Sequence, residues 1–187
     1  MVSNGLLQRD RVLLATIGLL SYFALSGVLA PMGLLIDPIS AQFNVSDVVA
    51  ARLLSGFSSG NLLGAVLALF VMSWFGYKRI VIAIYASAAA ILLSLGFASH
   101  PALVWFLLAG LGLTLGIGLA VAAQLIAVIY QSDQRAALLV ATDSSFSLAG
   151  TVMAGLTKVL LAVQIFGTEN WTNPYLPILV VALLIVT

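Results

Sequence analysis

The sequence predicts an all-α, polytopic membrane protein with six transmembrane helices. Of its 187 residues, 63% are hydrophobic and only 7% are charged, whereas soluble domains carry about 25% charged residues. Six apolar runs meet or approach the length of about 20 residues that a helix needs to cross a bilayer. We therefore expect residues 1–187 to form one transmembrane domain, with the lipid bilayer as its surroundings.

The first two helices are bounded by a proline and by capping residues. The first is expected over residues 12–36, ended by Asp37-Pro38, because proline disfavours a helical conformation in the residue before it. This run is too long for a signal-peptide core, so we expect it to be retained. The second helix is expected over residues 46–73, with Ser46 and Asp47 suited to capping its amino end.

The later helices are separated by polar or proline-containing connections. The third is expected over residues 77–99 and the fourth over 102–130, and the fifth follows the polar loop 131–135. The sixth starts near Pro174, and the sequence stops about two-thirds of the way across the bilayer at helical rise. We expect either a product truncated at its carboxyl end or a half that assembles with a partner.

Lysines and arginines lie in alternate connections, which indicates the orientation because such residues concentrate on the cytoplasmic side. The connections on one side hold Asp37, His100 and Glu169, and those on the other hold Arg9, Arg11, Lys78, Arg79 and Arg135. We expect a cytoplasmic amino terminus and a bacterial inner membrane. Arg52, near the outer end of the second helix, is expected to reach the interface along its stem.

Glycines at every fourth position predict close helix packing. They are Gly56, Gly60 and Gly64 on the second helix and Gly112 and Gly116 on the fourth. Small residues at this spacing let backbones approach each other in a membrane. Residues 58–64 and 144–150 also share the pattern Ser-Ser-x-x-Leu-x-Gly. They lie on helices that two inverted three-helix repeats would equate.

Asp143 is the main candidate for function, on a run from Ala136 to Gln164 that carries Lys158 near its other end. Asp143 lies 8 residues past Arg135, which is about 12 Å inside the helix. A charge at membrane depth normally faces a protein interior or a water-filled path. Asp143 could exchange a proton or hold a cationic group, or it could anchor one helix to another by hydrogen bonds. Lys158 could attract an anionic solute or reach the outer interface.

Uncharged polar residues within the apolar runs are the other pathway candidates. Amides and hydroxyls can hydrogen-bond a sugar-like or zwitterionic solute, but they can equally bond a neighbouring helix. These candidates are Ser144, Ser147, Gln124, Asn61, Tyr22 and Ser26. Tyr22 and Ser26 are expected to form a strip of polar side chains on the first helix together with Ser21.

The motifs that other classes of function require are absent from the sequence. The sequence has no phosphate-cradling loop, no metal-ligand spacing and no nucleophile beside a base, so we expect neither an enzyme nor a cofactor. The few basic residues form no patch, so we expect no nucleic-acid partner.

The connection at 73–79 resembles the signature between the second and third helices of major facilitator superfamily transporters, in which an acid precedes basic residues around a glycine. Gly76, Lys78 and Arg79 fit this signature, while Ser73 stands where the acid is expected. The residues that carry a narrower resemblance, to TsgA-like transporters related to the fucose and glucose/galactose permeases, are Tyr130, Gln134, Arg135, Thr142, Asp143, Ser144, Phe146, Ser147, Ala149 and Gly150.

The resemblance implies the amino-terminal half of a transporter that works by alternating access, with its solute bound near the bilayer midplane. We expect symport of a small polar solute, coupled to protons, and a second six-helix half or partner membrane protein. The alternative is a non-transporting six-helix scaffold that docks a partner through its glycine ridges.

Overall fold

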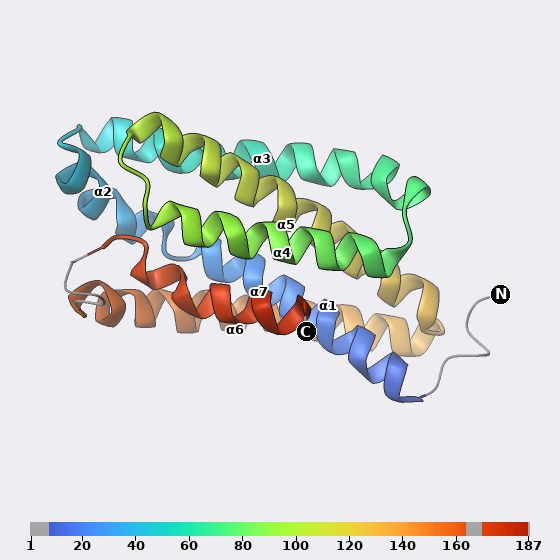
Figure 1. Ribbon diagram of the computed structural model, residues 1–187. Helices are drawn as coiled ribbons and strands as arrows, with labels where there is room; N and C mark the ends of the chain where they lie inside the picture. The colour runs from blue at the N-terminus through green and yellow to red at the C-terminus, as the bar shows by residue number, and fades with distance from the viewer. Residues whose placement is uncertain (1–7, 164–169, 187) are drawn as a thin grey trace.

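The computed structural model describes residues 8–163 and 170–186, and these residues form helices with short connections (Figure 1). Within them, five stretches are long and apolar enough to cross a membrane, and a shorter apolar stretch covers Asn173–Val186. The predicted all-helical class is confirmed for the part of the chain that is described. The expected sixth crossing is present only as the shorter stretch.

The first crossing is broken into pieces, which corrects the predicted helix over 12–36. Helix α1 covers Gln8–Leu29, the 3₁₀ helix η1 covers Met32–Leu35, and α2 covers Ile36–Phe43. The break falls at Pro31, which caps η1. Asp37-Pro38 does not end a helix as expected. Pro38 lies in the first turn of α2, where amide hydrogens have no intrahelical acceptor and proline is tolerated.

Helix α3 covers Asp47–Trp74, within one residue of the prediction at each end. Ser46 stands at its N-cap, but the Ser46 side chain makes no capping hydrogen bond, contrary to expectation. Asp47 instead accepts a hydrogen bond of 2.6 Å from the hydroxyl of Ser40 on α2. The side-chain contact at this end therefore joins two helices rather than capping one.

Helix α4 covers Tyr77–Leu95 and ends four residues earlier than predicted, while α5 covers Pro101–Ile129. Helix α6 covers Ser132–Ala162 and begins inside the expected loop 131–135. Polar residues continue a helix readily where it leaves the bilayer for water. After residues 164–169, which lie outside the described ranges, η2 covers Asn173–Tyr175 and α7 covers Leu176–Val186.

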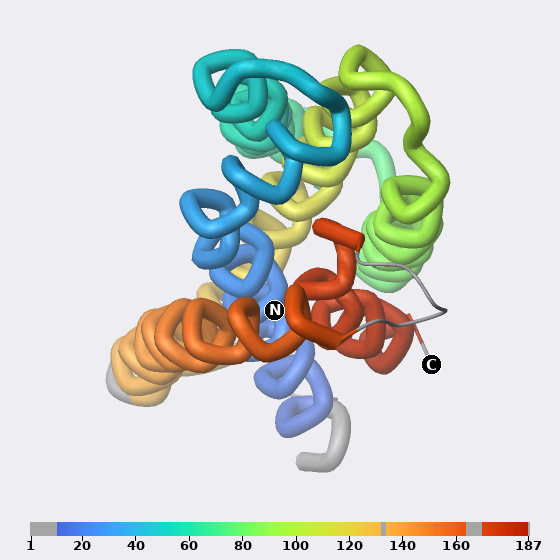
Figure 2. The backbone as a smooth tube through the Cα atoms, turned by 90° about the vertical axis from the view of Figure 1, so that its left-hand side faces the viewer, coloured from blue at the N-terminus to red at the C-terminus, as the bar shows by residue number. Residues whose placement is uncertain are grey.

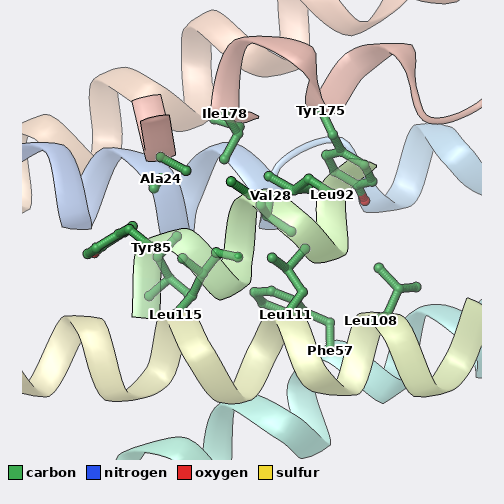
Figure 3. Close-up of a cluster of buried hydrophobic side chains, with 14 of the residues drawn as sticks. Ala24, Val28, Phe57, Tyr85, Leu92, Leu108, Leu111, Leu115, Tyr175 and Ile178 are labelled. Atoms are coloured by element: carbon green, nitrogen blue, oxygen red, sulfur yellow. The ribbon is translucent and has the colours of Figure 1, made fainter. Parts of the chain in front are cut away.

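The helices form three layers, with α1 and α5 between α3 and α6 on one side and α4 and α7 on the other (Figure 2). The most extensive contact is between α3 and α5, followed by α1 with α6 and α4 with α5. Buried side chains of α1, α3, α4, α5 and α7 meet at the centre, where Val28, Phe57, Leu111 and Ile178 lie together (Figure 3).

The α3–α5 contact has no room for side chains at its glycines. A methyl group on Gly60 would overlap the carbonyl oxygen of Ala109, and one on Gly112 would overlap that of Phe57. Gly56, Gly64 and Gly116 likewise face the carbonyl oxygens of Trp105, Leu113 and Asn61 across the same contact. All five glycines singled out in the sequence thus lie where the two backbones touch.

Candidate functional site

Helix α6 is the least covered of the five long helices. In its most apolar window only 17% of the residues are buried, compared with 33–50% in the other four. Its buried side is short and includes Thr142, Ala149 and Met153. A large part of α6 therefore faces whatever surrounds the described chain.

The uncovered side of α6 carries a polar strip, which we define as Asp143, Ser144, Ser147, Thr151 and Lys158. All five side chains are exposed. At 3.6 residues per turn they occupy an arc of about 100° on the helix. Leu148, Val152 and Val159 are also exposed and occupy the adjoining arc. From Asp143 to Val159 the two charges and the small hydroxyls are thus separated from these apolar side chains, whereas Val140, one turn earlier, is exposed on the same arc as the polar strip.

Asp143 lies beside Tyr22 of α1. The side chains of Tyr22 and Thr142 lie close to one another, and the Tyr22 hydroxyl lies within electrostatic reach of Asp143. Thr142 also donates a 2.7 Å hydrogen bond to the carbonyl oxygen of Leu139 in its own helix. Asp143 itself remains exposed, so it is not sealed between α6 and α1.

Two serines of α1 take different positions. Ser26 is buried, and its Oγ lies 3.2 Å from the place that a Cβ on Gly150 of α6 would occupy. Ser21 is also buried and donates a 2.7 Å hydrogen bond to the carbonyl oxygen of Ile17. The expected strip on α1 is therefore divided: Tyr22 and Ser26 face α6, and the Ser21 hydroxyl bonds to its own helix.

The two amides lie apart from this pair, on α3 and α5. Asn61 belongs to the close α3–α5 contact, where its Nδ2 is buried and has no hydrogen-bond partner. Gln124 lines a cavity of about 660 Å³ between α3, α5 and α6, and its Oε1 is buried without a partner. The structure thus brings Tyr22, Thr142 and Asp143 together but leaves Asn61 and Gln124 at separate places.

The connection between α3 and α4 holds the residues of the loop signature. Ser73 donates a 2.6 Å hydrogen bond to the carbonyl oxygen of Phe70, and Gly76 is the N-cap residue of α4. Lys78 and Arg79 are exposed in the first turn of α4.

Two interhelical hydrogen bonds at the site were not expected from the sequence. Ser145 of α6 donates a 2.9 Å hydrogen bond to the carbonyl oxygen of Leu19 on α1. Tyr130, at the end of α5, donates one of 2.6 Å to the carbonyl oxygen of Arg11. No sequence pattern marks such pairs, because each depends on how two helices are rotated toward one another.

Long apolar helices packed in layers, with polar residues on an uncovered face, define a polytopic helical membrane protein. Sequence similarity to known proteins narrows this class further. The chain is 29% identical over 157 residues to a TsgA homolog of Erwinia tasmaniensis, covering 83% of the chain and 39% of that protein. It is 27% identical over 186 residues to a TsgA homolog of Citrobacter koseri, covering 95% and 45%.

Protein TsgA of Escherichia coli O17:K52:H18 is 26% identical over 186 residues, again covering 95% of the chain and 45% of the relative. The predicted resemblance to the TsgA-like branch of the major facilitator superfamily is thereby confirmed over most of the chain. No protein-family profile matches the chain. The chain spans less than half the length of the curated relatives it matches.

Proposed function

We propose that the chain acts as the amino-terminal half of a secondary transporter that moves a small polar solute by alternating access, in symport with protons. The similarity to TsgA proteins supports a transporter-like membrane protein. The solute, the protons and a second six-helix half are our proposals, and they rest on the uncovered face of α6.

The pattern of helix contacts supports two inverted three-helix repeats. In such repeats α1 corresponds to α5, α3 to α6 and α4 to α7. The α3–α5 contact then corresponds to the α6–α1 contact, and the α4–α5 contact to the α7–α1 contact. The α1–α5 and α4–α7 contacts each correspond to themselves. Inverted repeats of this kind place the solute near the bilayer midplane, where the repeats meet.

The observation that carries the proposal is the exposure of the polar strip at membrane depth. Asp143 lies 11 residues into α6, about 16 Å from its start. A carboxylate costs several kcal/mol in hydrocarbon and normally faces a protein interior or a water-filled cavity. Because the described helices leave the strip uncovered, we propose that a second half and an aqueous path lie against it.

The geometry suggests a role for each candidate. Asp143 would carry the proton or hold a cationic group of the solute, with the Tyr22 hydroxyl within electrostatic reach of it. Ser144 and Ser147 would supply hydrogen bonds beside it. Lys158 is 15 residues further along α6 and exposed, and it would attract an anionic group or reach the interface. Ser26, Gln124 and Asn61 remain candidates for secondary contacts with the solute.

We further propose that the amino terminus and the Arg79 end of the bundle are cytoplasmic, in the inner membrane of a bacterium. The relatives from Citrobacter koseri and Escherichia coli are bacterial proteins. Basic residues in the connections on that side support this orientation.

Cysteine labelling in the membrane tests the aqueous path. The chain has no native cysteine, so single cysteines at 143 and 147 can be exposed to a membrane-impermeant thiol reagent. We expect both to react, whereas cysteine at 148, on the apolar side of the same turn, should not. Protection at 143 and 147 in the assembled protein would contradict the path and favour the scaffold.

A further inference from the structure

A crevice opens where α3 and α4 diverge from their shared connection. It has a volume of about 500 Å³, and Val71 of α3, Ile80 and Ile84 of α4 and Ile117 of α5 contribute to its walls. Contacts between α3 and α4 are sparse, and α5 crosses obliquely between them (Figure 1). The crevice is therefore bounded by three helices, α3, α4 and α5, and α6 does not contribute to its walls.

The walls are mostly apolar, and the polar group that α5 contributes is already bonded. Thr114 is buried, and its hydroxyl donates a 2.8 Å hydrogen bond to the carbonyl oxygen of Leu111. Ser87 of α4 also lines the crevice and is exposed, but the other wall residues below Arg79 are apolar or already bonded. Walls of this kind suit a hydrocarbon chain.

A cation stands at the mouth of the crevice, and α3, α4 and α5, the helices that line it, place no acidic residue beside it. Arg79 lines the crevice and Lys78 precedes it, both exposed in the first turn of α4. The amino end of a helix already carries a partial positive charge, so two cations there attract an anion. The sequence has no acidic residue between Asp47 and Asp133, so neither α4, α5 nor the rest of α3 supplies one.

Aromatic side chains place this mouth at the membrane surface. Trp74 and Phe75, at the end of α3, are 72% and 57% exposed. Tryptophan is enriched at the level of the lipid headgroups, where its ring contacts both apolar and polar surroundings. We therefore expect the mouth of the crevice and its two cations to lie at the depth of the lipid headgroups.

We infer that the crevice binds an anionic phospholipid of the leaflet at the Arg79 end. Its phosphate contacts Arg79 and Lys78, and one acyl chain lies between α3 and α4. A mostly apolar crevice that ends in cations at the interface matches the two parts of such a lipid. The inference concerns the lipid side of the bundle and holds whether or not Asp143 lines a solute path.

Fluorescence quenching can test this site, because Trp74 stands beside its mouth. The other tryptophans, Trp105 and Trp171, lie toward the opposite end of the bundle, and Trp74→Phe identifies the signal of Trp74. The chain is placed in phosphatidylcholine nanodiscs that contain increasing fractions of brominated phosphatidylglycerol. We expect Trp74 to be quenched at fractions well below those needed with brominated phosphatidylcholine.

Two variants and one control locate the site. Each cation near an anionic surface contributes about 1 kcal/mol, so Arg79→Gln should lower the preference for phosphatidylglycerol about fivefold. Arg52→Gln removes an exposed arginine at the other end of α3 and should leave the preference unchanged. Ala83→Phe adds a ring to the crevice wall and should reduce the preference although both cations remain.

Three results would overturn the inference. If Arg79→Gln kept the full preference for phosphatidylglycerol, the cation would not bind the headgroup. An unchanged preference in Ala83→Phe would show diffuse attraction to the membrane surface instead of a seated lipid. Loss of the preference on adding inorganic phosphate at the same concentration as the lipid would show a site for a free anion.

Discussion

The hydroxyl of Ser145 on α6 donates a hydrogen bond of 2.9 Å to the main-chain carbonyl oxygen of Leu19 on α1. This bond is one of the contacts that set how α6 is rotated against α1. With Ser145 held there, Thr142 points to Tyr22 and is buried, and Asp143 remains exposed. The direction in which the polar strip faces therefore depends in part on a contact that is uncharged and lies outside the polar strip.

Removing this hydrogen bond should loosen α6 by a small, measurable amount. Interhelical hydrogen bonds in membranes contribute about 0.6 kcal/mol on average, so Ser145→Ala should lower the free energy of unfolding by about that much. The control is Ser144→Ala, because Ser144 bonds to the carbonyl oxygen of Val140 in its own helix. Unfolding in mixed micelles measures both. Equal losses in the two variants would contradict a specific contact with α1.

A methyl group at the α3–α5 contact should be far more damaging. Gly60→Ala forces apart two backbones that touch at Ala109, and overpacking of this kind costs about 1–3 kcal/mol. Gly155→Ala is the matched control on α6, since nothing lies within 4 Å of a Cβ there. The same unfolding measurement compares them. If Gly60→Ala were as stable as Gly155→Ala, the helices would be further apart than the structure shows.

The lengths and positions of the helices were largely predictable, because hydrophobic length is a local property of the sequence. Helix α3 and helix α5 begin and end within one residue of the prediction. The errors arose at residue types that occur both within the first turn of a helix and in the connections between helices. Pro31 follows the end of α1, whereas Pro38 lies in the first turn of α2. The polar run at 131–135 was expected to be a loop, although α6 begins at Ser132.

The site was predictable only in part. A charged residue inside an apolar run can be recognised directly, so Asp143 and Lys158 stand out in the sequence. Their surroundings depend on helix rotation and on contacts between distant segments, such as Tyr22 with Thr142. The sequence alone also could not show that Gln124 lines a cavity while Asn61 lies in a tight helix contact.

Two asparagines near the start of α7 should affect different helices. Asn173 donates hydrogen bonds of 3.5 and 3.0 Å to the carbonyl oxygens of Leu160 and Val163 at the end of α6. Those carbonyls have no partner within the helix, so Asn173→Ala should destabilise the last turn of α6 by about 1 kcal/mol. Hydrogen exchange of the amides in that turn should become about fivefold faster.

Asn170 provides the comparison. It donates a single hydrogen bond, of 3.4 Å, to the carbonyl oxygen of Gly96 at the end of α4. Asn170→Ala should therefore leave exchange at the end of α6 unchanged and have at most a small effect near Gly96. Faster exchange at both helix ends in both variants would show that the connection acts as a single unit.

The proposed proton coupling leads to a sharper prediction for Asp143→Asn. Asparagine has nearly the shape of a protonated aspartate but cannot release a proton. A protein that couples uptake to protons through this carboxylate should lose uptake driven by a pH gradient, yet still exchange solute across the membrane at equal pH. Proteoliposomes that contain the chain with its proposed second half can be screened with labelled sugars and zwitterionic amino acids, with an internal pH dye to follow the protons.

The matched control is Asp47→Asn, the same chemical change at the start of α3, where the carboxylate accepts a hydrogen bond from Ser40 outside the polar strip. Coupled uptake should persist in this variant, because nothing in the proposed path depends on the charge of Asp47. Uphill uptake that survives Asp143→Asn would mean that the proton is carried elsewhere. Loss of both uptake and exchange would instead assign Asp143 to binding the solute, since exchange requires binding but no net movement of protons.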